Sequence, residues 1–182
     1  MVFIKEKFNN PGIIWTLGMY KPYWVYTPNG KIVNPDFDTF SGRILDVKQS
    51  KLPALNDFFK RLDRNVSKGV SLCVVPSHDP ANTESGMKWI AQRLAQGGRV
   101  DATSCLVRHK KIDKLAHGGE RSKAVHLNSI RVDNQDLVKN KKVLLLDDVT
   151  TSNNSLWACQ ELLLKGGATV VQCLALAKTE GY

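Results

Sequence analysis

The sequence contains no long apolar run. None approaches the ~18 consecutive apolar residues that a membrane-spanning helix requires. Charged residues already appear in the opening segment MVFIKEK, which is too early for the apolar part of a secretory signal peptide. We therefore expect a cytoplasmic protein with no membrane segment.

Cysteine is also scarce. The 4 cysteines form neither a CxxC pair nor the Cys/His spacing of a metal site. Cys73, Cys105 and Cys173 lie in apolar, strand-like runs, and Cys159 lies in a predicted helix. This pattern predicts reduced thiols in the core.

Acidic residues are outnumbered, 17 against 26 basic ones, which leaves a formal net charge of +9. Such a charge favours an anionic partner, and a polyphosphate ligand, a nucleic acid or an acidic surface would each fit. The chain has 182 residues, of which 42% are hydrophobic, and can bury the core of one domain with a small appendage.

The most informative stretch is residues 143–155, VLLLDDVTTSNNS. Its apolar start predicts a strand buried on both faces of a parallel sheet, ending at Asp147 and Asp148. A turn rich in hydroxyl and amide groups follows, and then a helix over 156–164. The first amides of a helix attract anions, whereas two acids suit neutral hydroxyls or a Mg²⁺ ion. The pattern predicts a sugar-phosphate site, and an ordinary strand-to-helix connection with capping residues is the alternative.

This stretch resembles the signature of type I phosphoribosyltransferases, in which a hydrophobic strand, two acids, a hydroxyl-rich loop and a helix follow one another. The resemblance implies an α/β fold with a Rossmann-like parallel sheet flanked by helices and a small N-terminal antiparallel hood. It also implies that Asp147 and Asp148 hold the ribose hydroxyls of phosphoribosyl pyrophosphate (PRPP) and, directly or through water, Mg²⁺. The loop residues implied to bind the 5′-phosphate are Thr150, Thr151, Ser152, Asn153, Asn154 and Ser155. Family members commonly dimerise, so we expect a homodimer.

Residues 70–76 predict another buried strand, and Ser77, His78 and Asp79 follow at its carboxyl end. Ligands of open α/β sheets bind beyond the carboxyl ends of the strands. The resemblance implies that this turn contacts the pyrophosphate of PRPP. The alternative for His78 is a histidine of an ordinary surface loop.

Residues 104–107 predict a third parallel strand, and a long polar, basic stretch follows over 108–123. Connections of this length are usually functional or disordered. In the family a mobile loop at this point closes over the active site and excludes water. The resemblance thus makes Arg108, Lys110 and Lys111 candidates for catalysis and Arg121 a candidate for pyrophosphate binding. A solvated basic loop is the alternative.

Within the family, the segment from Arg121 to residue 132 resembles the ComF-like branch. The chain departs from the family pattern at three points. Asn153 stands where most members have glycine, and Thr151 stands where purine-salvage members have an aspartate near the base. The ComF-like branch typically begins with a cysteine-rich metal-binding segment, and this chain has no early cysteine.

The first 50 residues carry aromatic residues and turn signals. Residues 23–33 predict a β-hairpin around an Asn-Gly turn, and 41–47 predict a further strand. We divide the chain into a β-rich hood or cover (1–50) and a phosphoribosyltransferase-like core (51–182). A cover would protect a sheet edge, whereas a hood would stack an aromatic residue on a base. The aromatic candidates are Trp15, Tyr20, Tyr23, Trp24 and Tyr26.

Two functions are consistent with these features. The first is a Mg²⁺-dependent transfer of the phosphoribosyl group from PRPP to a nitrogenous base, with release of pyrophosphate. The second is a non-catalytic protein of the same fold that senses PRPP or binds nucleic acid. Two features favour it: the charge of +9, and the lack of an acidic residue at position 151, near the base.

Overall fold

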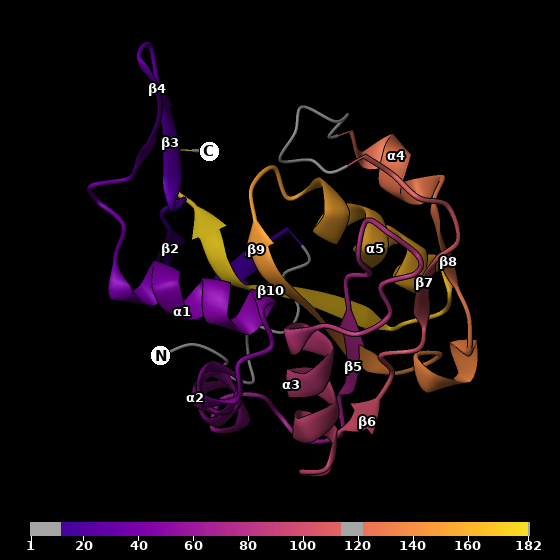
Figure 1. Cartoon of the computed structure of the whole chain (residues 1–182). Coiled ribbons are helices and arrows are strands. Elements are labelled where there is room, and N and C mark those ends of the chain that lie inside the picture. Colours follow the sequence, from indigo (N-terminus) through magenta and orange to yellow (C-terminus); the bar gives the residue numbers. More distant parts are fainter. Residues whose placement is uncertain (1–11, 114–121, 182) are drawn as a thin grey trace.

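The computed structural model describes residues 12–113 and 122–181. At its centre is a six-stranded sheet with the order β1-β10-β9-β5-β6, and β2 pairs with β10 beyond the end of β1 (Figure 1). Every pair in this sheet is parallel, which confirms the predicted fold class. The strands are β1 (Ile14–Thr16), β2 (Met19–Tyr20), β5 (Ser71–Val74), β6 (Val100–Asp101), β9 (Lys142–Thr150) and β10 (Val170–Thr179).

The sheet is covered on both faces. Leu144 and Leu146 of β9 belong to one buried cluster, and Val143 and Leu145 belong to another. Alternate residues of a strand point to opposite faces, so this central strand is apolar throughout because both of its faces are packed. Three helices cover the first face and one covers the second. They are α1 (Thr39–Lys48), α2 (Leu52–Asp63) and α3 (Gly86–Ala95), and then α5 (Asn154–Lys165).

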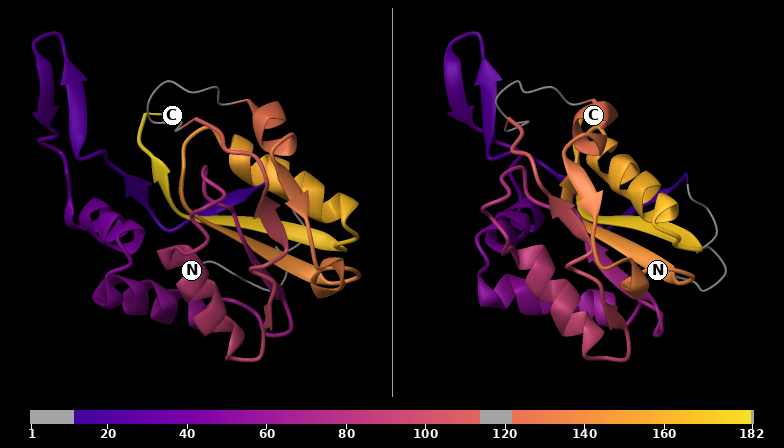
Figure 2. Two further views of the ribbon diagram at one scale, coloured as in Figure 1. Left: turned by 45° about the vertical axis from the view of Figure 1, so that its right-hand side comes forward. Right: turned by 90° about the vertical axis from the view of Figure 1, so that its right-hand side faces the viewer.

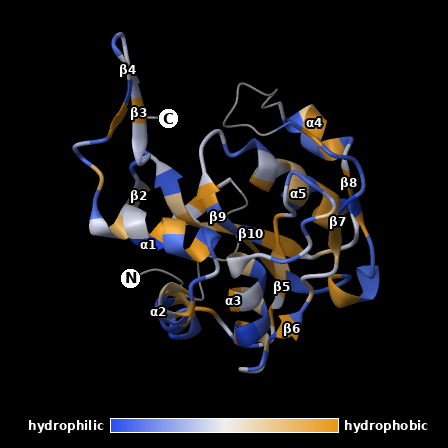
Figure 3. Cartoon of the chain, in the orientation of Figure 1, coloured by the Kyte–Doolittle hydropathy of each residue, from blue (hydrophilic) through white to orange (hydrophobic). Residues whose placement is uncertain are grey.

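Two antiparallel pairs lie outside the main sheet, β3 (Trp24–Thr27) with β4 (Gly30–Val33) and β7 (Leu106–Arg108) with β8 (Ile130–Val132). The β3–β4 pair is the predicted hairpin, and it stands clear of the helices and the sheet (Figure 2). Hydrophobic residues gather along β10 in the middle of the molecule, whereas the tip of the hairpin is hydrophilic (Figure 3). The remaining elements are α4 (Lys123–Leu127) and the 3₁₀ helix η3 (Gln135–Leu137).

The strand predicted over 41–47 is wrong, because these residues belong to helix α1. The β-branched residues Ile44 and Val47 favour a strand locally, but they lie three positions apart, on one face of a helix, and both are fully buried. Asp38 caps the helix by accepting a hydrogen bond from the Ser41 amide at 2.7 Å. Tertiary packing and the cap thus outweigh β propensity.

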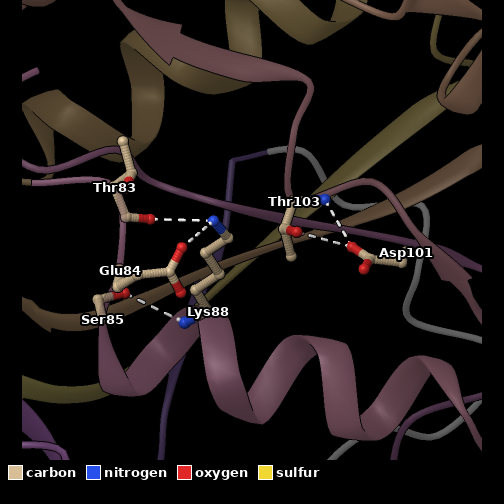
Figure 4. Close-up of polar contacts among 6 residues, drawn as sticks. All are labelled: Thr83, Glu84, Ser85, Lys88, Asp101 and Thr103. Atoms are coloured by element: carbon tan, nitrogen blue, oxygen red, sulfur yellow. Dashed lines mark hydrogen bonds and ion pairs between the residues drawn. The ribbon is translucent and has the colours of Figure 1, made fainter.

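The third parallel strand predicted over 104–107 is also wrong. The parallel neighbours of β5 are β9 and the short strand β6. The predicted segment is a strand only from Leu106, in β7, which pairs antiparallel with β8. The chain leaves the sheet edge at Asp101, whose carboxylate accepts hydrogen bonds from the amide and the hydroxyl of Thr103 at 3.0 and 2.7 Å (Figure 4). This turn breaks the ladder before residue 104.

The N-terminal part of the chain joins the core. β1 and β2 extend the main sheet along β10, and α1 contributes Ile44 and Val47 to the main hydrophobic cluster. The division of the chain at residue 50 stays a prediction, and the contacts of β1, β2 and α1 cross it. In the described ranges, every helix is too short or too polar to cross a bilayer.

Candidate functional site

The carboxyl ends of two neighbouring strands form the candidate site. β5 and β9 pair in parallel, so the turn after β5 and the acids near the end of β9 meet at one edge of the sheet. A pocket of about 810 Å³ opens there, and Ser77, His78, Asp79, Asp147 and Asp148 all line it. The structure therefore brings together two of the groups that the sequence predicts, as expected for ligand sites of parallel sheets.

The predicted end of the central strand needs a correction. β9 continues through both acids to Thr150, and Asp147 and Val149 still pair with Ala175 and Ala177 of β10. Because neighbouring residues of a strand point to opposite faces, the two carboxylates diverge: one reaches a residue of α5 and the other a residue of α1.

Asp147 lies on the α5 side. Its carboxylate accepts a hydrogen bond from the Asp148 amide at 2.9 Å, and the Ser155 hydroxyl lies 3.5 Å away. Burial, together with the negative charge of Asp148, raises the pKa of Asp147 to about 8. A bound cation or hydroxyl donors at this carboxyl group would favour its ionised form and lower that pKa.

Asp148 lies on the opposite side, where Lys48 from the last turn of α1 places its Nζ atom 3.3 Å from Oδ1. Lys48 also lines the pocket. This lysine was not predicted from the sequence. In the sequence, Lys48 follows a segment that was predicted as a strand. The segment is a helix, and only the helical geometry brings Lys48 to Asp148.

The predicted phosphate turn connects β9 to α5 in three residues, 151–153. Asn153 has a φ of 64°, the left-handed conformation that glycine favours and asparagine tolerates. Its side chain accepts a hydrogen bond from the Thr150 hydroxyl at 2.8 Å. The first amides of α5 lack partners within the helix, as in any helix, and begin directly after this turn.

The phosphate turn lies beside the pocket and is not part of its wall. Ser155 links the turn to Asp147, whereas the Thr151 hydroxyl shares a hydrogen bond of 2.8 Å with the Thr179 hydroxyl at the end of β10. Ser152 is exposed and Asn154 is the first residue of α5. The pocket and the turn therefore flank the acids on different sides.

The predicted pyrophosphate turn is held by the chain that follows β7. Lys111 forms an ion pair of 2.6 Å with Asp79, and the Ile112 amide donates to the His78 carbonyl at 3.1 Å. The hydrogen bond from Lys111 is the main reason why the pKa of Asp79 lies below its ordinary value. The start of the basic stretch thus packs against this turn.

Arg108 is buried, with a side chain that ties β7 to the same turn. Its guanidinium donates to the Ser77 carbonyl and to the Ser129 hydroxyl, the latter at 2.5 Å. Burial lowers the pKa of Arg108. In residues 12–113 and 122–181 no carboxylate forms an ion pair with it, so its positive charge contributes to the potential of the pocket that it lines.

The other predicted residues are more scattered. Lys110 is exposed and lies outside the pocket wall, and Arg121 lies outside the described residues. Among the aromatic candidates, Tyr20 lies close enough to Lys48 and Asp148 for their charges to act on its hydroxyl. Burial raises its pKa, and the charges of Lys48 and Asp148 act on it in opposite directions. Trp24 and Tyr26 are exposed on the hairpin, away from the pocket.

Residues at the beginning of α3 also line the pocket, and their polar contacts are drawn in Figure 4. The Ser85 hydroxyl caps this helix by accepting from the Lys88 amide at 3.1 Å. The Lys88 ammonium folds back onto the Thr83 carbonyl at 3.0 Å and the Glu84 carboxylate at 2.7 Å. These residues were not identified from the sequence, because nothing in the local sequence places them in the same pocket as Asp147 and Asp148.

The acids supply part of a Mg²⁺ site. Mg²⁺ usually keeps several waters and binds one or two carboxylates together with phosphate oxygens of a ligand. Asp147 and Asp148 both line the pocket, but their carboxylates diverge, so one would bind the ion directly and the other through water. In the described part of the chain, no three His, Cys, Asp or Glu side chains are grouped to hold a metal alone. The donor set therefore fits a Mg²⁺ ion that a phosphate ligand helps to hold.

Fold and pocket together define an α/β protein with a ligand-sized site at the carboxyl edge of a parallel sheet. No family model matches the chain, and no curated protein matches it either. It resembles the structure of an allosteric regulatory enzyme of purine biosynthesis at 12% identity and a TM-score of 0.46, over 84% of this chain and 34% of that one.

Two phosphoribosyltransferases are also similar in structure. Hypoxanthine phosphoribosyltransferase of Trypanosoma cruzi has 10% identity and a TM-score of 0.36, over 78% of this chain and 67% of that one. Hypoxanthine-guanine phosphoribosyltransferase of L. donovani has 14% identity and a TM-score of 0.34, over 75% of this chain and 71% of that one. The chain spans about a third of the length of the purine-biosynthesis enzyme. At these scores the likeness carries no information about activity.

Proposed function

We propose that this protein binds PRPP with Mg²⁺ and transfers the phosphoribosyl group to a nitrogenous base, releasing pyrophosphate. The observation that carries the proposal is the position of the acids. Asp147 and Asp148 stand at the end of the central strand, between the Ser77–His78–Asp79 turn in the pocket and the hydroxyl-rich turn that begins α5. A sugar with phosphate groups at two ends needs an anion site on each side of its hydroxyls.

In this proposal the acids accept hydrogen bonds from the ribose hydroxyls and hold Mg²⁺, directly or through water. The turn from Thr150 to Ser155 binds the 5′-phosphate, and the turn at 77–79 binds pyrophosphate. Bound Mg²⁺ would offset negative charge on the pyrophosphate oxygens. Lys110, Lys111 and Arg108 add positive charge on the same side, and Arg121 is proposed to join them.

The transfer itself needs no covalent intermediate with the protein. A nitrogen of the base forms a bond to C1 of the ribose, and the bond between C1 and pyrophosphate breaks with its electron pair on the departing oxygen. The nitrogen gives its proton to solvent. The chain contributes by positioning the reactants and by stabilising charge on the leaving group.

Isothermal titration calorimetry with PRPP and Mg²⁺ tests this proposal. Asp148→Asn should weaken binding by roughly 100-fold, since a charged hydrogen bond and a metal ligand are lost together, worth about 3 kcal/mol. Asp57→Asn is the matched control, because Asp57 pairs with Arg61 on α2, away from the site. Equal PRPP affinity of Asp148→Asn and the native chain, with circular dichroism unchanged, would contradict the assignment.

Turnover needs a separate measurement, the release of pyrophosphate in the presence of a panel of bases. The alternative function is a PRPP sensor or nucleic-acid-binding regulator of the ComF-like branch. The observation that favours it concerns Thr151, which stands where purine-salvage members have an aspartate near the base. Its hydroxyl is hydrogen-bonded to the Thr179 hydroxyl, and threonine supplies no carboxylate to contact a base. Binding of DNA or RNA that PRPP modulates, without pyrophosphate release, would decide for the regulator. A homodimer and a cytoplasmic location remain predictions.

A further inference from the structure

Lys48 contacts Asp148, one of the two carboxylates that the proposed function assigns to a divalent cation. Its Nζ atom is 3.3 Å from Asp148 Oδ1, with the lysine side chain 41% exposed and the aspartate side chain 29% exposed. Both residues line the pocket. A carboxylate oxygen that contacts an ammonium group at this distance cannot approach a metal ion from the same direction.

The backbone that carries Lys48 is firmly placed. Ile44 and Val47 of α1 are fully buried in the main cluster. The backbone oxygen of Val47 also packs against Gly86 at the start of α3, so closely that any side chain at Gly86 would collide with it. Lys48 follows Val47 directly. Its position at the pocket is therefore set by the packing of two helices and not by its ion pair.

The ion pair, in contrast, is weak enough to be exchanged. Partly exposed ion pairs contribute little to stability, because water screens the charges and the long lysine side chain loses freedom. The lysine side chain has a flexible stem and a compact charge that can turn to another acceptor within its reach. With its backbone fixed and its ammonium group free to change partners, Lys48 can act as a counter-ion that moves from one anionic group to another.

We propose that Lys48 competes with a divalent cation for Asp148 and is displaced onto an anionic ligand when cation and ligand bind together. This inference rests on the proposed function, in which a Mg²⁺–polyphosphate ligand occupies the pocket. Without a ligand, the ammonium group occupies Asp148 and repels a divalent cation. With a polyphosphate in the pocket, the ammonium gains a new partner and Asp148 is released. Lys48 would therefore make cation binding depend on the ligand.

Electron paramagnetic resonance detects free Mn²⁺ and so measures how much Mn²⁺ the protein binds. This measurement tests the role of Lys48 without requiring turnover. In the absence of PRPP, Lys48→Met should bind Mn²⁺ about three- to tenfold more tightly than the native chain, because competition and repulsion are both removed. Lys51→Met is the matched control, since Lys51 pairs with Asp46 at 2.7 Å outside the pocket. It should bind Mn²⁺ as the native chain does.

Addition of PRPP should tighten Mn²⁺ binding in the native chain and much less in Lys48→Met. Equal or weaker Mn²⁺ binding by Lys48→Met without PRPP would overturn the role of Lys48. That result leaves the proposed function intact if the native chain still binds PRPP with Mg²⁺. Conversely, tighter Mn²⁺ binding by Lys48→Met in a chain that does not bind PRPP would support the competition at Asp148 while refuting the proposed function.

Discussion

The backbone oxygen of Val47 lies against the α-carbon of Gly86, where a β-carbon would stand only 2.1 Å from it. This contact joins the end of α1 to the start of α3 at the rim of the pocket, with Lys48 on one side and Ser85 on the other. The distance leaves no room for any residue except glycine. A contact between two backbones thus holds α1 against α3 at this part of the pocket rim.

Gly86→Ala should destabilise the protein by about 1–3 kcal/mol, because the new methyl group forces α1 and α3 apart. Urea denaturation measures the loss. The matched control is Gly42→Ala within α1, where a β-carbon would meet its nearest neighbour, Phe37, at 3.7 Å. That change should be neutral or stabilise by up to about 1 kcal/mol, since alanine is the better helix former. Equal stability of the two variants would show that the helices separate without cost.

Asn153 combines a left-handed backbone with a side-chain acceptor for Thr150. Asn153→Gly should change stability by less than about 1 kcal/mol, because relief of the backbone offsets the loss of one hydrogen bond. Asn153→Ala should cost about 2 kcal/mol, because alanine keeps the unfavourable φ and loses the hydrogen bond.

The ranking of these two variants at position 153 is the measurement, obtained from urea midpoints. Alanine as stable as glycine would mean that the turn changes its conformation on substitution. PRPP binding to Asn153→Gly gives a second readout, since a glycine turn keeps its amides available to a phosphate.

His126 gives the stability a defined pH dependence. Burial, and then the charge of Arg108, whose guanidinium lies 3.5 Å from the ring, lower the pKa of His126 from 6.5 to about 4. Between these values the unfolded chain binds a proton that the folded chain does not. Stability should therefore be complete above pH 6.5 and fall as the pH decreases toward 4, by at most about 3 kcal/mol from this residue.

His126→Asn should remove this contribution while keeping a polar atom near Arg108. The measurement is the difference in unfolding free energy between the native chain and the variant, at several pH values between 4 and 7. The difference cancels the titration of the carboxylates that both chains share. A difference that does not vary with pH would show that His126 is accessible to protons in the folded state.

The sequence by itself determined the elements whose pattern is local. The apolar run at 143–146 is a strand because both faces of β9 are packed, and the Asn-Gly turn fixes the β3–β4 hairpin. Pro53 lies in the first turn of α2, where proline is favoured because its missing N–H has no helical partner to bond. The acids and the following turn were also evident, since residue types and spacing alone identify them.

Tertiary structure decided whatever depends on contacts between distant segments. Residues 41–47 have β propensity, yet they form a helix because Ile44 and Val47 fill the space between α2, α3 and the sheet. The ion pair of Lys48 with Asp148 joins residues 100 positions apart in the chain. Arg108 was predicted in a mobile basic loop, but it lies in β7, is buried and donates a hydrogen bond to the Ser129 hydroxyl. The local sequence determines the backbone preference of each segment. The positions of residues 41–47, Lys48 and Arg108 depend instead on which distant surfaces pack together and which charges are neutralised in the folded chain.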